Sequence, residues 1–410
     1  MSVLLPSRTN RTEKPSGNRV AVVARPRVHA IDAVRGFCLL NIFINHLSEG
    51  VLNRASPSNL GLSDSADVFV LLAGFSAYLS SENLCFRASV AHLWSRAVSL
   101  YLHNLILIGV SLAILTALGL AVGTNVLIEG HLLASLASTD IATAVWSLLS
   151  FQQSVGFSMV LRLYVALMLM APVLIWVARR RWWLPLPIVT TIWLVGGHFG
   201  LVAHDSLTGV PLALTILPWT LIFGIGVILG AAFRQKIPLP RSPVLLAGAV
   251  TVVAGYIAFL VLSRTWPDGQ AWLMARNEDF WGGASKTYQS PLRVLHTLSL
   301  AYIFIRCARA PVLRLVHNVR ANNIFARIGR RSLHVFMAGA LIAAPANEII
   351  HLANRHWGAN SLTSIVIELA LAGAGIALMI WIAGRRLHPQ PPTGLMSGPA
   401  LEGPPPVRAP

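Results

Sequence analysis

The sequence predicts an all-α integral membrane protein with about ten transmembrane helices and both ends in the cytoplasm. Two features of its composition indicate a membrane protein: 55% of the 410 residues are hydrophobic, and only 11% are charged. Soluble domains contain about 25% charged residues. The third observation is that the basic residues, which give a net charge of +17, stand in short blocks between apolar runs. Such blocks are typical of membrane loops and argue against nucleic-acid binding.

A transmembrane helix needs about 20 mostly apolar residues, and a window of this length selects ten segments. In chain order they are 31–52, 65–81, 98–122, 157–178, 183–203, 211–233, 243–263, 292–308, 332–353 and 361–384. The second and the eighth are the shortest. We see no internal repeat of the kind that relates the inverted halves of many transporters.

The distribution of Lys and Arg predicts the orientation, because cytoplasmic loops carry an excess of both. With the N-terminus inside, the inner loops contain Arg87, Arg96, Arg179, Arg180, Arg181, Arg234, Lys236, Arg241, Arg309, Arg314, Arg320, Arg327, Arg330, Arg331, Arg385 and Arg386. The outer loops contain far fewer: Arg54, Arg264, Arg276, Lys286 and Arg355. Both ends of the chain are therefore expected in the cytoplasm.

Composition divides the chain into three parts. Residues 1–28 are polar and basic, and no small-residue cleavage site follows the first apolar run, so we expect a retained first helix rather than a signal peptide. Residues 29–386 form the transmembrane domain. Residues 387–410 are rich in Pro and Gly and, like 1–28, are expected to be disordered. The scattered cysteines suggest packing residues rather than disulfides or a metal site: Cys38, Cys85 and Cys307.

Two outer segments, 123–156 and 264–291, are long for simple turns. Long ordered loops often bind ligands. The alternative is that both are solvated connections with tryptophans anchored at the membrane interface.

The first apolar run contains Arg35 and His46. Ionisable side chains inside a membrane cost about 2.5–3.5 kcal/mol each on insertion scales, so both are candidate functional residues. Their spacing places them within about 20° of the same helix face and about 16 Å apart. This geometry suits acyl coenzyme A, with its phosphates at Arg35 and its thioester near His46 as general base. Alternatively, Arg35 reaches the surface or pairs with Asp32, and His46 bonds a neighbouring helix.

Asp64 and Asp67 begin the second apolar run. If the first two helices form a hairpin, a carboxylate could fix the tautomer of His46 and stabilise its imidazolium. The alternative is that both acids cap their helix and complement its dipole. Glu368, within the last apolar run, has no partner that the sequence identifies.

"IDAVRGFCLLNIFINH" followed by "DVFVLLAGF" resembles the R-x10-H and D-x-F-x-x-x-x-G-F pattern of integral-membrane acyltransferases, which move acyl groups from cytoplasmic donors to extracytoplasmic sugars. Four later segments are similar to the OpgC branch, the osmoregulated periplasmic glucan succinyltransferases: "LRLYVALMLMAP", "LPWTLIFGIGVILGA", "SKTYQSPLRVLHTLSLAYI" and "IGRRSLHVFMAGALI". The resemblance spans residues 28–385 in order. Ala73 and His334 depart from the wider family, and the role of His334 is not assigned.

The resemblance implies that His46 is the catalytic base and that Arg35 is a donor-site or structural arginine. The topology places Arg162 and Arg293 near the outer surface. Either could bind the free carboxylate of a succinyl group, as could Lys286. Structural ion pairs or headgroup contacts are the alternative.

The resemblance therefore implies a multi-pass O-acyltransferase of the bacterial inner membrane. It would transfer an acyl group, expected to be succinyl, from cytoplasmic acyl-CoA to a periplasmic glucan or other glycan. We expect membrane lipids as further partners, and no permanently bound cofactor, metal or nucleic acid. Direct transfer and an acyl-enzyme both remain open, although no second obvious nucleophile is evident. The alternatives are an acetyl-CoA-dependent polysaccharide O-acetyltransferase, a transporter of a small anion and a donor-handling subunit of a separate transferase.

Overall fold

The computed structural model describes residues 29–385 except 48–49, 55, 57–60, 154, 156–157, 205–208, 210, 213, 264, 276–278 and 308–309. The predicted terminal segments, 1–28 and 387–410, lie outside the described residues. In the described part the regular elements are helices, apart from an isolated bridge between His204 and Pro211. The elements are α1 (His29–Asn45), α2 (Val51–Arg54), α3 (Ser65–Ser81), α4 (Phe86–Val122), η2 (Thr124–Val126), α5 (Gly130–Ser138), α6 (Ile141–Leu149), α7 (Ser158–Arg180), α8 (Pro185–His198), α9 (Ile216–Arg234), α10 (Pro243–Ser263), α11 (Pro267–Ala275), α12 (Pro291–Arg306), α13 (Pro311–His317), α14 (Ile324–Arg330), α15 (Ser332–Trp357) and α16 (Leu362–Gly384).

Each of the ten predicted segments contains a helix, so the all-α class is confirmed. Among the described residues, six helices are long and apolar enough to cross a membrane, namely α4, α7, α9, α10, α15 and α16. The other four, α1, α3, α8 and α12, have 17, 17, 14 and 16 residues. They rise about 21–26 Å, against about 30 Å of hydrocarbon. The chain is a multi-pass membrane protein, and the count of ten crossings stays a prediction.

The first predicted segment, 31–52, is two helices rather than one. α1 ends at Asn45 and α2 begins at Val51. The buried Glu368 of α16 accepts hydrogen bonds from the backbone N–H groups of Val51 (2.7 Å) and Leu52 (2.6 Å). A carboxylate therefore satisfies N–H groups that the start of α2 leaves unpaired. This contact supplies the partner of Glu368 that the sequence did not identify.

A second buried acid anchors the segment 123–156, which is predicted to lie outside. Glu348 of α15 accepts hydrogen bonds from the backbone N–H groups of Ile128 (2.8 Å) and Glu129 (2.9 Å), which precede α5. The segment folds into η2, α5 and α6 rather than a plain loop. Both Glu348 and Glu368 thus hold connecting segments to long helices.

Glycines allow α3 and α9 to pack backbone against backbone. A Cβ atom added at Gly74 would collide with the carbonyl group of Phe223, and one added at Gly226 would collide with that of Leu71. Small residues permit this approach between membrane helices, where packing replaces the hydrophobic effect as the driving force. The position of α3, which begins at the candidate site, therefore depends on this contact.

Close backbone packing at glycines also joins α1 to α14. A Cβ atom at Gly36 would meet the carbonyl of Phe325, and one at Gly329 would meet the carbonyl of Asp32. α1 and α3 are also in contact with each other. Two close helix pairs thus fix α1, which carries Arg35 and ends before His46, and α3, which carries Asp67 and begins after Asp64.

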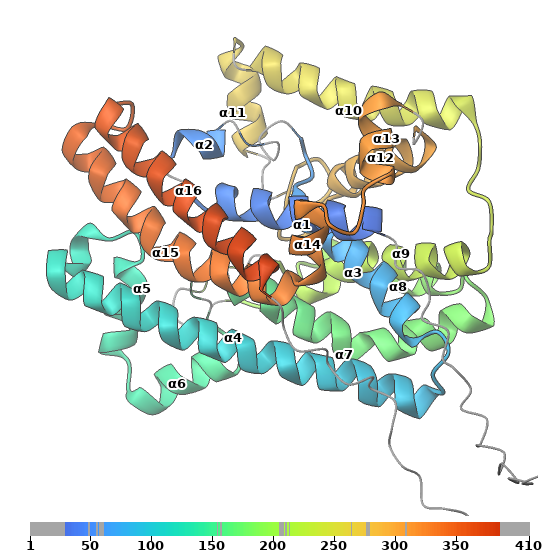
Figure 1. Ribbon diagram of the computed structural model, residues 1–410, viewed down its shortest axis with the longest axis horizontal. Coiled ribbons are helices and arrows are strands. Elements are labelled where there is room, and N and C mark those ends of the chain that lie inside the picture. Colours follow the sequence, from blue (N-terminus) through green and yellow to red (C-terminus); the bar gives the residue numbers. More distant parts are fainter. Residues whose placement is uncertain are drawn as a thin grey trace, which may run out of the picture.

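α10 and α12 lie beside the main bundle of helices. Figure 1 shows α4, α7, α15 and α16 in the main bundle, with α10 along the top edge above α12. α10 packs on α12 and α11, and its buried residues are only Ala249 and Ser263. An apolar helix with so little buried surface suits contact with lipid. The face of α12 opposite this helix looks toward α1 and α3, where the cavity described below lies.

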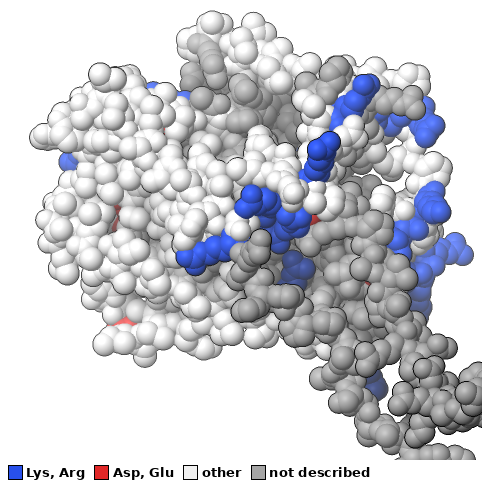
Figure 2. Space-filling model, in the orientation of Figure 1, with Lys and Arg blue, Asp and Glu red and all other residues white. Residues whose placement is uncertain are grey.

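Basic side chains are unevenly distributed over one face of the molecule (Figure 2). In the face shown in Figure 2, Lys and Arg gather over the right half and the centre, whereas the left part is almost free of visible charge. Arg234, which ends α9, and Arg180, which ends α7, belong to loops predicted to be cytoplasmic. The segregation is consistent with the predicted orientation, which stays a prediction.

Candidate active site

The N-terminus of α3 is built by Asp64 and Asp67. The Asp64 carboxylate accepts a hydrogen bond from the N–H of Ala66 (2.8 Å), and the Asp67 carboxylate accepts one from the N–H of Asp64 (2.8 Å). This capping box satisfies N–H groups that a helix start leaves unpaired. The alternative that both acids cap their helix is confirmed, and both carboxylates have further contacts.

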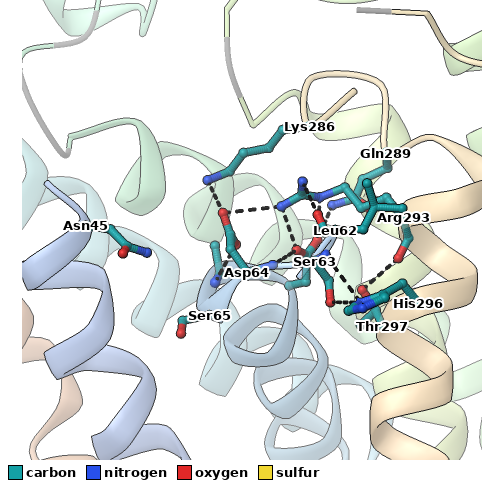
Figure 3. Close-up of polar contacts among 12 residues, drawn as sticks. Asn45, Leu62, Ser63, Asp64, Ser65, Lys286, Gln289, Arg293, His296 and Thr297 are labelled. Atoms are coloured by element: carbon teal, nitrogen blue, oxygen red, sulfur yellow. Dashed lines mark hydrogen bonds and ion pairs between the residues drawn. The ribbon is translucent and has the colours of Figure 1, made fainter. Parts of the chain in front are cut away.

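Two cations lie against these carboxylates, as Figure 3 shows for Asp64. The Lys286 ammonium is 2.5 Å from Asp64 Oδ2. The Arg293 guanidinium bridges both acids, with Nη2 2.8 Å from Asp67 Oδ2 and 3.2 Å from Asp64 Oδ2. Burial alone raises the pKa of the Asp64 carboxyl, but Lys286 and Arg293 outweigh this effect and hold that pKa below its usual value. Two carboxylates are thus paired with two cations.

The fully buried Asp67 is surrounded by donors. Gln289 Nε2 donates to Asp67 Oδ1 (2.6 Å), and Arg293 Nε donates to the same oxygen (3.3 Å). Arg293 Nη1 donates to the carbonyl of Leu62 (2.8 Å). Removing one partner of a buried ion pair costs about 3–5 kcal/mol. Arg293 and Asp67 therefore hold the start of α3 against α12.

Lys286 projects from a turn that is fixed to two helices. The indole N–H of Trp219 in α9 donates to the carbonyl of Lys286 (3.1 Å), and that of Trp193 in α8 donates to the carbonyl of Gln289 (2.7 Å). The Lys286 side chain is 39% exposed, against 7% for Arg293. Lys286 is therefore the cation of this cluster that a ligand can reach.

His46 directly follows α1. Its Nδ1 lies 2.6 Å from the carbonyl oxygen of Ile42, one turn earlier. A carbonyl oxygen only accepts, so Nδ1 carries the proton and Nε2 of the neutral ring carries the lone pair. The imidazole also interacts electrostatically with Lys286 and Asp64. The ring is thus held in the tautomer that a general base at Nε2 requires.

Arg35 belongs to α1, and its side chain contacts α3. Its Nη2 donates to the hydroxyl of Ser76 (2.7 Å) and to the carbonyl of Leu72 (3.2 Å), and its guanidinium carbon is 5.9 Å from the centre of the Phe69 ring. These contacts stabilise a buried charge and tie the two helices together. The donor-binding role stays a prediction for Arg35.

A cavity of about 790 Å³ lies between α1, α3 and α12 and reaches the segment after α9. Along α1 its lining extends from Ala30 to Asn41, about 16 Å at 1.5 Å per residue. Its middle part is lined by apolar side chains. One end is polar, with Asn41, Ser63, Asp64, Ser65 and Thr297. The opposite part of the lining includes Arg241 and Arg306.

The guanidinium of Arg306 is incompletely satisfied by the protein. Its Nε is buried and has no hydrogen-bond partner within the described residues. A buried donor without an acceptor costs about 1–3 kcal/mol. An anionic group bound between Arg306 and Arg241 would remove this cost.

Arg162 is the remaining predicted substrate-binding residue. It is buried in α7, and its Nη1 donates to the carbonyl of Phe151 (3.2 Å). The contact ties α7 to the segment that follows α6. A substrate-binding role for Arg162 stays a prediction.

Sequence reasoning missed Ser63, Gln289 and Arg306. Ser63 and Gln289 are uncharged. Neither has the membrane-insertion cost that makes an ionisable residue a candidate functional residue. Arg306 ends α12, where a basic residue is ordinary because it complements the helix dipole. The available signal was the polar stretch "SKTYQSP" directly before an apolar run, which contains Gln289.

The comparisons with known proteins agree with the resemblance drawn from the sequence. A family model described as OpgC protein matches residues 27–386. No curated protein and no solved structure matches the chain.

Proposed function

We propose that this chain, which belongs to the OpgC family, is an O-acyltransferase of the bacterial inner membrane. It transfers an acyl group, which we propose to be succinyl, from cytoplasmic acyl-CoA to a hydroxyl of a periplasmic glucan or other glycan. Membership of the family supports a membrane acyltransferase that acts on a glucan. The donor, the acceptor and the direction of transfer are the finer parts of the proposal.

The cavity is the observation that carries the proposal. An acyl-CoA donor has a phosphate-bearing nucleotide, a long flexible arm and a thioester. Arg241 and Arg306 suit the phosphates, because guanidinium groups bind phosphate through paired hydrogen bonds. The apolar walls suit the arm over a length of about 16 Å, and the polar end beside Asp64 suits the thioester.

The donor enters from the cytoplasm in this proposal. Arg241 follows α9 and Arg306 ends α12, and both neighbouring loops are among the basic loops assigned to the inside. The outer turn with Lys286 and Gln289 lies at the other end of α12. The acceptor hydroxyl therefore approaches from the side of this turn.

His46 acts as the general base for the acceptor. Nε2 takes the proton of the sugar hydroxyl as its oxygen attacks the acyl carbonyl, and such catalysis contributes about 10²–10⁴-fold. The negative charge of Asp64 partly offsets the effect of the Lys286 ammonium on the imidazolium that forms. Asp67 and Arg293 keep the start of α3 in place. This division of roles is supported by their burial and by their mutual ion pair.

Lys286 binds the free carboxylate of the succinyl group in this proposal. Its ammonium has three donors, of which one contacts Asp64, and its side chain is accessible. Arg293 is less suited to bind this carboxylate, since its guanidinium already pairs with Asp64 and Asp67 and donates to the carbonyl of Leu62.

The test compares the intact chain with His46→Ala at matched abundance in cells, with acyl groups on periplasmic glycans measured by mass spectrometry. We expect succinyl groups with the intact chain and a loss of roughly 100-fold or more with the variant, because the base is removed. Unchanged acylation in the variant would contradict the role of His46. Acetyl instead of succinyl would contradict the role of Lys286, and no acylation with either chain would favour a transporter.

A further inference from the structure

We propose that Ser63 forms a covalent acyl-enzyme intermediate, with His296 as its general base. The proposal rests on the proposed function and divides its transfer into two steps. Neither residue was singled out for chemistry from the sequence.

Ser63 and His296 have the geometry of a nucleophile and its base. Ser63 Oγ is 2.7 Å from His296 Nδ1, and the backbone N–H of Ser63 points at the same nitrogen from 3.4 Å. A backbone N–H can only donate, so Nδ1 carries a lone pair rather than a proton in the neutral ring. The Ser63 hydroxyl therefore donates to Nδ1, as the activation of a serine requires. Figure 3 shows this contact beside Asp64.

Ser63 lies where the acyl-CoA donor would bind. It lines the polar end of the cavity together with Asp64, whereas both Ser63 and His296 are otherwise buried. Exclusion of bulk water protects an ester intermediate from hydrolysis. A thioester that lies along the cavity therefore meets the Ser63 hydroxyl at its end.

The backbone around Ser63 is held on both sides. The carbonyl of Leu62 accepts a hydrogen bond from Arg293, and the Asp64 carboxylate is paired with Lys286. The ring of His296 packs edge-on against Tyr256, with ring centres 5.7 Å apart. A reacting group held in one geometry gains rate because little ordering remains to be done in the transition state.

The first step transfers the acyl group to Ser63. The Ser63 hydroxyl proton moves to His296 Nδ1 while Oγ attacks the thioester carbonyl. The C–S bond breaks, and the thiolate leaves and takes a proton from water. The products are an ester on Ser63, a free thiol and a protonated His296.

The second step transfers the acyl group to the glycan. The acceptor hydroxyl gives its proton to His46 and attacks the Ser63 ester, and the protonated His296 returns its proton to Ser63 Oγ. His46 then releases its proton to water, which balances the proton taken up by the thiolate. In the view of Figure 3, Asn45, which precedes His46, and His296 lie on opposite sides of Asp64.

The experiment uses the full chain in lipid nanodiscs with succinyl-CoA and no glycan, followed by acid quenching and peptide mass spectrometry. We expect a succinyl ester on the peptide that contains Ser63. His46→Ala should carry the same ester and should keep it when glucan is added, since only the second step needs His46. Ser63→Ala should carry no ester and should lose roughly 100-fold or more of the transfer to an added glucan, the scale of a lost proton-transfer partner.

Two variants control for misfolding. Ser63→Cys keeps a nucleophile and should take up succinyl as a thioester that hydroxylamine cleaves. Ser80→Ala removes an exposed hydroxyl from the far end of α3 and should leave labelling and transfer unchanged. Full transfer by a folded Ser63→Ala, or succinyl on another residue, would overturn the intermediate but not the proposed function. Absence of any transfer by the unmodified chain would overturn both.

Discussion

In the proposed function, Arg306 is the residue on which donor binding depends most directly. Its Nε is buried at the cavity without a partner in the described part of the chain, and Arg241 lines the same cavity. Arg35, by contrast, is engaged with α3 through Leu72 and Ser76. We therefore propose Arg306 and Arg241 for phosphate recognition, while the predicted donor-binding role of Arg35 stays a prediction.

Arg306→Gln should weaken binding of the acyl donor. A hydrogen bond to a charged group is worth about 1.5–3 kcal/mol, so KM for acyl-CoA should rise about tenfold or more, with a smaller change in kcat. Steady-state kinetics of the purified chain would measure both constants. Arg320→Gln, an exposed change in the loop between α13 and α14, is the matched control. An equal rise in KM for both variants would show a general effect of charge instead.

The charged residues of the site show what could be predicted from sequence at this scale. Asp64 and Asp67 were singled out as possible partners of His46, and Lys286 and Arg293 as cations for a succinyl carboxylate. The structure brings all four together. Their pairing could not be predicted, because the partners lie more than 200 positions apart. The contact of His296 with Ser63 was missed for the same reason.

At the scale of elements, the crossing of α3 and α9 positions the site. Gly74 and Gly226 leave room for carbonyl groups of the opposite helix, so the two backbones touch. Helix existence was predictable from apolar runs, but such contacts were not, since a glycine within a run does not reveal its neighbour. The separate start of α2 at Val51 was missed because its N–H groups are paired with Glu368 of α16.

Gly74→Ala should destabilise the protein. Its new methyl group would collide with the backbone of Phe223, which cannot move as a side chain can, and overpacking costs about 1–3 kcal/mol. Thermal unfolding in detergent should show a lower Tm. Gly109→Ala in α4, where nothing lies within 4 Å of the added atom, is the control and should keep or raise the Tm. Equal Tm values for the two variants would argue against the close α3–α9 contact.

Over the whole molecule, the position of the basic surface agrees with the position of the arginines that line the cavity. Basic residues gather on one part of the face shown in Figure 2, and two arginines line the part of the cavity that faces the loops assigned to the inside. The acidic cluster and His46 lie near Lys286, whose turn is predicted to be outside. The concentration of basic residues in the loops assigned to the inside was predictable, because the positive-inside rule depends only on which loops contain Lys and Arg. The cavity was not, since it is formed by helices distant in sequence.

The central claim is that an acyl group crosses the membrane through this chain to reach a glycan. The most direct measurement uses proteoliposomes with labelled succinyl-CoA in one compartment and glucan in the other, since neither crosses a lipid bilayer unaided. We predict label on the glucan with the intact chain and none with His46→Ala. Label that appears only when donor and glucan share one compartment would contradict the account.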